Sequence, residues 1–162
     1  MAPTKHRPDA FPLSETQRTL PIALLRAREA VMERFRPMLR EIDVTEQQWR
    51  VLRVVQEAGE IDATQLARAA CVLAPSLTRI LKTLEARGLI ALHRDAADRR
   101  RTLVNISAVG KALLHEAGQT SAGIYKEIEE RLGADRIADL LDALENVTQD
   151  LDLSNADAPD DG

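Results

Sequence analysis

A run of three arginines, Arg99 to Arg101, lies in the stretch RDAADRRRTLVNIS. Guanidinium groups form paired hydrogen bonds with phosphate and carboxylate oxygens, so such a run is suited to binding a polyanion. Most charge runs belong to solvated loops, and the arginines alone do not decide between the two readings. Their flanks do, because LIALHRD and TLVNIS have the length and alternation of short strands. The sequence therefore predicts a β-hairpin whose tip is basic.

A second set of polar side chains lies just upstream, in APSLTRILKTLEARG. Apolar residues recur there at helical spacing and define one face of a helix: Leu77, Ile80, Leu81 and Leu84. The remaining surface carries four side chains that could contact DNA: Ser76, Thr78, Arg79 and Lys82. Arginine pairs with guanine O6 and N7, serine and threonine meet several bases, and lysine meets phosphate. Such a surface is also ordinary on a solvated helix, so its neighbours in the fold must decide.

Two short helices followed by a hairpin form the winged helix-turn-helix arrangement, in which the second helix enters the major groove. ATQLARAACVL predicts the first of these helices, so the pattern is complete. The hairpin tip would then place an arginine in the minor groove and other arginines on phosphates or in solvent. The wing residues expected at DNA are Asp98, Arg99, Arg100 and Arg101. We expect a mainly α-helical fold with a small β-hairpin wing, a winged helix-turn-helix DNA-binding lobe and a helical dimerisation region.

The charge distribution favours the same partner, although the net charge of the chain is −4. Residues 61–107 hold eight cationic and only four acidic side chains, and the last third of the chain is acidic. Aromatic residues make up only 2% of the chain, so aliphatic side chains must build the core. The single cysteine, the missing signal-peptide pattern and the lack of a long apolar run predict a cytoplasmic protein.

The two ends of the chain predict self-association. An apolar stripe begins at Leu20, and another runs from Ile137 to Leu151. Neither has a role in the DNA-binding lobe, so they either pack within one chain or build a homodimer that matches a pseudo-palindromic site. The domains expected are a disordered arm (1–18), a dimerisation helix (19–44), the winged helix-turn-helix lobe (45–107), two further dimerisation helices (108–153) and an acidic disordered tail (154–162).

Catalytic and cofactor motifs are absent from the sequence. HExxH, GxSxG, phosphate-binding glycine loops and Cys/His clusters do not occur, and the three histidines, His6, His93 and His115, are scattered. We therefore expect no enzyme, no cofactor and no metal. The remaining alternative class is an adaptor protein, which would not distinguish a promoter from random duplex DNA.

The wing sequence resembles that of the MarR family of bacterial transcription regulators. Asp95, Asp98 and Arg100 match the family's pattern of Asp, two residues, Asp, one residue, Arg. Ala97 replaces a frequent arginine, and the second strand ends in Ile-Ser rather than Leu-Thr. LTRILKTLEARGLI resembles the recognition helix and first wing strand, and the resemblance covers about residues 20–151. It implies that Arg100 is the minor-groove residue and that Asp98 orients its guanidinium.

Within the family, three segments are most similar to the subfamily that regulates degradation of homoprotocatechuate, an aromatic acid: LPIALLRAREAVMERFRPML, TEQQWRV and ACVLAPSLTRIL. This similarity implies a dimeric repressor of an aromatic-acid catabolic operon, released from its operator by a small phenolic or aromatic carboxylate. The family's effector pocket lies between the dimerisation helices and the DNA-binding lobe.

Three residues match or suit that effector pocket: Arg28, Trp49 and Arg53. Trp49 can stack on a phenyl ring, and Arg53, one turn further on, can pair with a carboxylate. Arg28 lies among apolar positions at helical spacing, so it should face inward and needs an anion. Structural alternatives stay open: a salt bridge from Arg28, for instance to Glu29 or Glu33 elsewhere in the dimer, core packing for Trp49, and a solvated Arg53.

Cys71 offers a redox-sensing alternative, because some family members sense oxidants with a cysteine. Theirs lies near the start of the first helix, whereas Cys71 lies beside the turn before the recognition helix, among apolar residues. We expect a buried, inert thiol.

Overall fold

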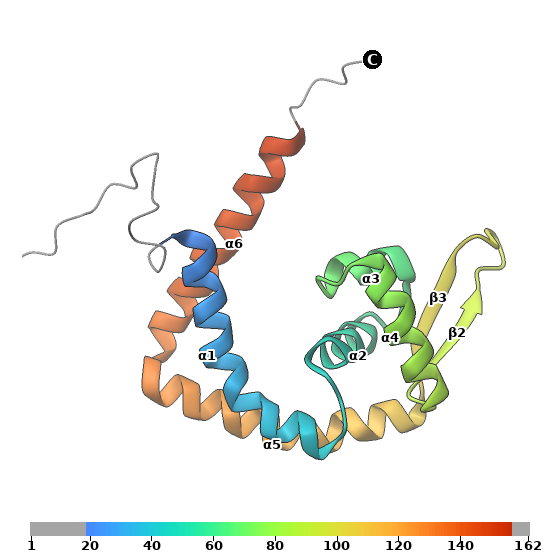
Figure 1. The fold of residues 1–162 in the computed structure, drawn as a ribbon, viewed down its shortest axis with the longest axis horizontal. Coiled ribbons are helices and arrows are strands. Elements are labelled where there is room, and N and C mark those ends of the chain that lie inside the picture. The colour runs from blue at the N-terminus through green and yellow to red at the C-terminus, as the bar shows by residue number, and fades with distance from the viewer. Residues whose placement is uncertain (1–18, 157–162) are drawn as a thin grey trace, which may run out of the picture. The chain divides into compact units, whose positions relative to one another are not determined.

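The computed structural model describes residues 19–156, and side chains from 19 to 151. The elements are α1 (Leu20–Glu41), α2 (Glu46–Ala58), β1 (Glu60–Asp62), α3 (Ala63–Ala69), α4 (Ala74–Ala86), β2 (Ile90–Arg94), β3 (Thr102–Ile106), α5 (Ala108–Leu132) and α6 (Ala134–Ala156) (Figure 1). The chain forms two compact units, residues 1–117 and 118–162, so α1 groups with the winged lobe and α5 crosses the boundary. The predicted arm lies outside the described residues, whereas α6 extends to Ala156, beyond the predicted start of the tail.

The helix boundaries follow from local chemistry that the sequence carries. The Thr45 hydroxyl accepts the Gln48 N–H at 3.1 Å, and the Gln48 amide accepts the Thr45 N–H at 3.0 Å, so the predicted capping box is confirmed. Gly59 (φ 74°) and Gly88 (φ 69°) end α2 and α4 in the left-handed region that glycine adopts without a steric penalty. α1 continues through Pro37 to Glu41.

The sheet has three strands in the order β1–β3–β2, all antiparallel. The expected hairpin of β2 and β3 is confirmed, but the segment Glu60–Asp62, expected to be a short link, is a strand. Ile61 pairs with Val104, and Leu92 pairs with Val104 from the other side. Val104 is fully buried, so the central strand is held on both edges by backbone hydrogen bonds and on one face by the core.

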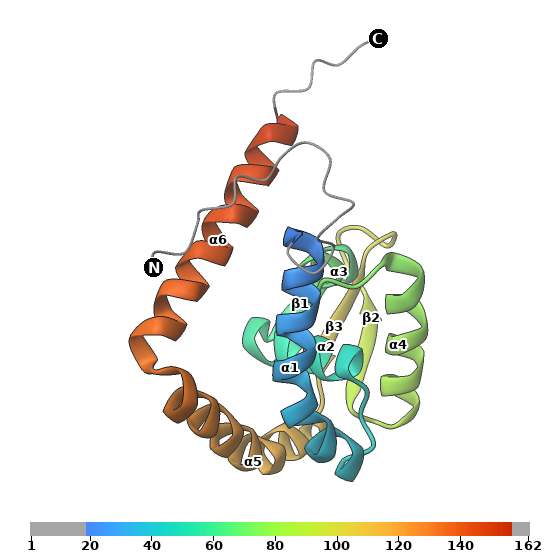
Figure 2. The same cartoon turned by 60° about the vertical axis from the view of Figure 1, so that its left-hand side comes forward.

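The core of the first unit is aliphatic, as the low aromatic content requires. Its most buried leucines are Leu52 of α2, Leu66 of α3 and Leu84 of α4, and all four predicted inward residues of α4 are buried. Figure 2 shows α4 running beside β2, with which it packs. This packing turns the polar side of α4 outward, which positions the candidate DNA contacts.

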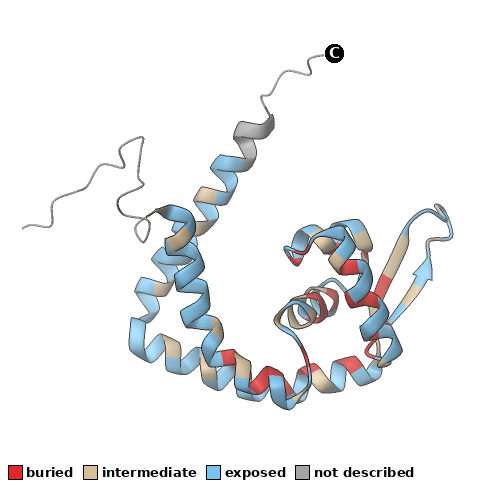
Figure 3. Cartoon of the chain, in the orientation of Figure 1, coloured by how far each residue is buried: buried red, intermediate tan, exposed pale blue. Residues whose placement is uncertain are grey.

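Each compact unit also presents an apolar helix face to solvent. The first turns of α1 expose Leu20, Leu24 and Leu25, whereas its last turns bury their apolar residues (Figure 3). In the second unit, α6 exposes Leu140 and Leu141. None of the described helices is long and apolar enough to cross a membrane.

Gly110 provides a test of how α5 joins the sheet. Ser107 caps α5 by accepting the Gly110 N–H at 2.9 Å and donates its hydroxyl to the Gly88 carbonyl at 2.6 Å. A β-carbon on Gly110 would lie 2.1 Å from the Leu89 carbonyl oxygen, which is backbone and cannot move aside alone. Gly110→Ala should lower the free energy of unfolding by about 1–3 kcal/mol, the usual cost of overpacking, in a urea titration.

Gly118→Ala, on the same helix, is the matched control, because nothing lies within 4 Å of its added β-carbon. It should leave stability unchanged or raise it by up to about 1 kcal/mol. Equal effects of the two substitutions would contradict the close approach at Gly110.

Candidate nucleic-acid interface and ligand site

The outward face of α4 carries the four side chains predicted at DNA. Thr78, Arg79 and Lys82 are exposed and Ser76 is half-buried. The Thr78 hydroxyl donates to the Ala74 carbonyl at 3.2 Å, which leaves its oxygen free to act as an acceptor. The face can therefore offer an acceptor from Thr78 and five donors from Arg79 to a groove.

Several cations around α4 and the wing have no acidic partner within residues 19–151. They form no ion pair or hydrogen bond through their side chains: Arg68, Arg79, Lys82 and Arg99. This is notable in a chain with 26 acidic and 22 basic residues, in which α1, α2 and α5 pair many of their arginines and lysines with glutamates. The unpaired cations leave an electropositive surface that attracts a polyanion.

The wing tip separates the three arginines into different roles. The side chain of Arg100 is 95% exposed, and Asp98 accepts its backbone N–H at 3.0 Å and its Nε at 3.4 Å. Asp98 thus lies where the sequence placed it, beside the Arg100 guanidinium. Arg99 is exposed, whereas Arg101 turns back towards the lobe.

Arg101 is a structural residue, which the sequence did not reveal. Its Nε lies 3.2 Å from the Asp62 carboxylate and its Nη1 lies 3.3 Å from Asp95. Asp62 is only 8% exposed and also caps α3 by accepting the N–H groups of Thr64 (2.9 Å) and Gln65 (3.2 Å). One buried carboxylate therefore ties the base of the wing to the first helix of the helix-turn-helix. The Arg101 side chain is 47% exposed, so it is not simply a solvated charge, and its expected phosphate contact stays a prediction.

Opposing effects set the pKa of Asp62. Burial raises it, but the backbone N–H of Gln65, the Arg101 guanidinium and the backbone N–H of Thr64 lower it by more, so the pKa lies below 3.8. Asp62 in turn raises the pKa of Arg101. The pair is charged throughout the physiological range.

Two further arginines anchor the helix-turn-helix through backbone carbonyls. Arg50 on α2 donates to the carbonyls of Ala70 (2.9 Å) and Cys71 (3.5 Å), at the end of α3. Arg87, at the end of α4, donates to the carbonyls of Asp43 and Ile42 in the α1–α2 turn. No sequence pattern marked either residue, because both contacts span at least 20 positions.

Arg28, predicted to face inward and to need an anion, is exposed, because the first turns of α1 lie in solvent, but it does have anionic partners in a cluster of four charged side chains. It contacts Glu29 at 3.0 Å and Glu46 at 2.5 Å, and Arg36 contacts the same two carboxylates at 2.6 and 2.8 Å. Arg28 thus has a structural salt bridge, but both partners belong to its own chain: Glu29 is the next residue of α1, and Glu46 belongs to α2. Burial raises the pKa of Glu46, but hydrogen bonds from Arg36 and Arg28 outweigh it, so the pKa is lowered.

The other two predicted effector residues lie on the same face of α2 as Glu46. Glu46, Trp49 and Arg53 follow helical spacing, which places them along one side. Trp49 packs partly against the core, and Arg53 is half-exposed and pairs with Glu57 at 3.4 Å. In the structure, which holds no ligand, Trp49 thus contributes to core packing and Arg53 is solvated, as the alternatives to ligand binding state. Arg28 reaches this face through Glu46.

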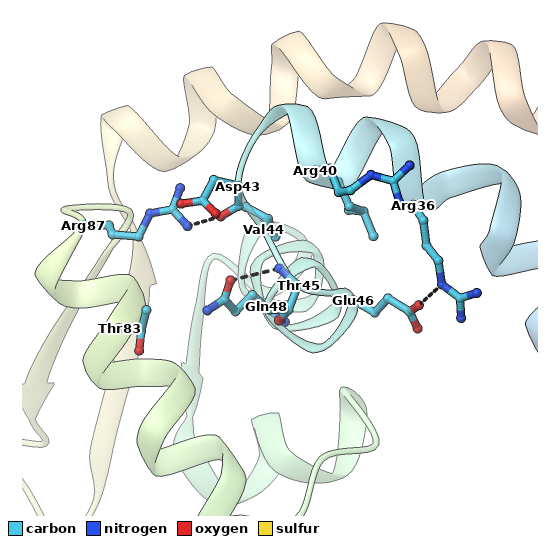
Figure 4. Close-up of a pocket in the computed structure, with 10 residues that line it drawn as sticks. Arg36, Arg40, Asp43, Val44, Thr45, Glu46, Gln48, Thr83 and Arg87 are labelled. Carbon is cyan, nitrogen blue, oxygen red and sulfur yellow. Dashed lines mark hydrogen bonds and ion pairs between the residues drawn. The ribbon is translucent and has the colours of Figure 1, made fainter.

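A hollow of about 570 Å³ lies at the N-terminus of α2 and is also lined by Glu46 (Figure 4). The close-up shows Arg87 bonded to Asp43 on one side and Arg36 bonded to Glu46 on the other. Thr83 of α4 and Gln48 of α2 also line it, whereas the three predicted effector residues do not. A small ligand could thus bind either on the α2 face or in this hollow, and Glu46 borders both.

The expectation of a buried Cys71 was wrong. The thiol is exposed, because the residue lies in the left-handed region (φ 51°) where the chain turns from α3 towards α4. His93 lies on the exposed side of β2, with Nε2 3.2 Å from the Glu60 carboxylate. Among the described residues, no group of histidine, cysteine and acidic side chains is placed to hold a metal ion.

Comparison with known proteins identifies the lobe. A profile of the MarR family matches residues 44–102. The homoprotocatechuate degradative operon repressor of Escherichia coli is 39% identical over 127 residues, which cover 78% of this chain and 86% of that protein.

Two solved structures extend the similarity to the fold. NadR in complex with 4-hydroxyphenylacetate is 39% identical with a TM-score of 0.74, over 85% of this chain and 97% of that one. The transcriptional repressor CouR bound to a 23-mer DNA duplex is 28% identical with a TM-score of 0.75, over 85% and 98%. The similarity to these regulators confirms the winged helix fold and the expectation of a regulator rather than an enzyme.

The Asp62–Arg101 link predicts an acid-sensitive contribution to stability. Because the pKa of Asp62 is lower in the folded chain than in the unfolded chain, its contribution is present above about pH 4 and is lost as the pH falls through the folded value. Asp62→Asn keeps a good helix cap but removes the charge. The variant should be less stable than the wild type at pH 7, and the difference should shrink between pH 4 and pH 2.

Arg100→Ala is the control for this titration, since Arg100 is exposed and outside the link, whereas Arg101→Ala should behave like Asp62→Asn. A stability difference between Asp62→Asn and the wild type that stays constant down to pH 2 would show that the carboxylate charge does not hold the wing.

Proposed function

The chain belongs to the MarR family, and from this premise we propose that it is a homodimeric repressor of an aromatic-acid catabolic operon, released from its operator by a small aromatic carboxylate. Its site of action would be the bacterial cytoplasm, where the operator lies.

The observation that carries the DNA-binding part is the unpaired positive charge on α4 and the wing. Arg79, Lys82 and Arg99 keep their full capacity for phosphates and base edges, although the chain as a whole is acidic. α4 supplies the helix for the major groove, and the tip of the wing supplies Arg100 for the minor groove. We assign Ser76, Thr78 and Arg79 to bases, and Lys82 and Arg99 to phosphates, with Asp98 orienting Arg100.

The exposed apolar faces support the dimer. A chain that stayed monomeric would leave Leu24 and Leu25 of α1, and separately Leu140 and Leu141 of α6, in water. Burying them against a second copy removes that cost and provides the two-fold symmetry that a pseudo-palindromic operator requires.

The effector part rests on the face of α2 that carries Glu46, Trp49 and Arg53. NadR, with 39% identity, was solved with 4-hydroxyphenylacetate, a ring bearing a carboxylate. Trp49 and Arg53 suit those two groups, and Arg28 is held close by through Glu46. An effector carboxylate would compete with Glu46 for Arg28. It releases DNA only if it binds the DNA-incompetent state more tightly.

We predict that Arg79→Ala and Lys82→Ala weaken DNA binding differently. On an operator selected from a random duplex pool, Arg79→Ala should lose affinity by about tenfold or more while its affinity for random duplex changes less, because a base contact is lost. Lys82→Ala should weaken both duplexes alike and reduce the salt slope by about one. Fluorescence anisotropy at several salt concentrations measures both.

Equal losses on operator and random DNA for Arg79→Ala would contradict its assignment to bases. A wild-type protein that bound both duplexes equally would favour the adaptor alternative instead.

We predict that Arg53→Gln weakens release of the operator by aromatic acids. Titrating hydroxyphenylacetates and benzoates against the protein–operator complex should require at least tenfold more acid for the variant, since a charged contact to the carboxylate is missing. Arg40→Gln is the control, because Arg40 is an exposed arginine that lines the hollow. Release impaired by Arg40→Gln but not by Arg53→Gln would place the effector in the hollow, and no release by any acid would remove the effector proposal.

A further inference from the structure

Leu73 is the most exposed large apolar side chain in the described part of the chain, with 78% of its surface accessible. It occupies the N-cap position of α4, where serine, threonine, aspartate or asparagine would satisfy a free backbone N–H, and its side chain makes no capping hydrogen bond. The next two residues, Ala74 and Pro75, are also exposed. The start of α4 is therefore a small apolar strip that forgoes the usual stabilisation of a helix end.

The surroundings of this strip are polar and cationic. Thr78 and Arg79 follow one turn later on α4, and Arg68 on α3 is exposed and unpaired. The other exposed large apolar residues lie on α1, α5 and α6, and the faces that we assign to the dimer are those of α1 and α6. Leu73 is thus separate from those faces and borders the electropositive surface of α4.

We propose that Leu73 contacts the C5-methyl group of a thymine in the major groove and thereby selects that base within each half-site. This proposal rests on the proposed DNA-binding function. The thymine methyl is the one apolar group that base pairs present in the major groove, and N-terminal residues of a recognition helix lie nearest to the base edges. The positive charge of the neighbouring side chains draws the duplex onto this end of α4, which buries Leu73 against the base.

The test replaces thymine by uracil, one position at a time, in the selected operator. Uracil lacks the methyl group but keeps every hydrogen-bonding atom, so only the apolar contact changes. For the wild type, one position per half-site should lose affinity by about fourfold, the effect of burying one methyl group. Leu73→Ala should bind the thymine and uracil versions of that position equally, and should keep any sensitivity at other positions.

Val109→Ala is the matched control, because Val109 is an exposed apolar residue at the start of α5. It should retain the wild-type response to uracil, and thermal unfolding should show that both variants fold.

Three results would overturn the proposal. One is that Leu73→Ala keeps the wild-type difference in affinity between thymine and uracil at every position, and another is that Val109→Ala loses this difference as well. The third is a change in oligomeric state on Leu73→Ala, which would make the strip a protein contact. Failure of the wild type to select any duplex from the pool would instead contradict the DNA-binding function itself.

Discussion

The Asp62 carboxylate is the point on which the DNA-binding lobe depends. The carboxylate is almost completely buried, and burial disfavours its ionised form. Three hydrogen-bond donors stabilise the ionised form by more than this desolvation cost. Two of the donors are backbone N–H groups of α3, and the third is Arg101 at the base of the wing. Because one group serves both elements, the helix-turn-helix and the wing are held in a fixed relation. Arg100, the preceding residue, lies outside this link, and its side chain is 95% exposed at the tip.

α2 links the remaining parts of the first unit. Its N-terminus joins α1 through the cluster of two arginines and two glutamates, and its middle joins the end of α3 through Arg50. The end of α4 joins the α1–α2 turn through Arg87. A ligand that displaced Glu46 from Arg28 would therefore act on the helix that also anchors α3. In this proposed mechanism, a local exchange of carboxylates changes the position of the DNA-contacting helices.

The sequence predicted the elements whose causes are local, and missed those that depend on distant contacts. The capping box at Thr45, the buried stripe of α4 and the hairpin all follow from patterns a few residues long. β1 was missed because three residues are too few to show alternation; its partner, β3, lies more than 40 positions later. The pairing of Arg101 was missed for the same reason, since its partner Asp62 is 39 positions away. The exposure of Cys71 follows from a positive φ that its apolar neighbours did not indicate.

The central claim is that the wing, fixed by Asp62 and Arg101, enters the minor groove at its tip. Affinity cleavage tests this claim most directly. A protein with Cys71→Ser and Arg99→Cys carries one cysteine, to which an iron–EDTA chelate is attached, so the radical source lies beside Arg100. The labelled protein is then bound to the selected operator. The account predicts strong cleavage in the minor groove next to each half-site, with the maxima on the two strands shifted in the 3′ direction, as radicals released in the minor groove produce. A 5′ shift, or cleavage no stronger than that by free chelate, would contradict it.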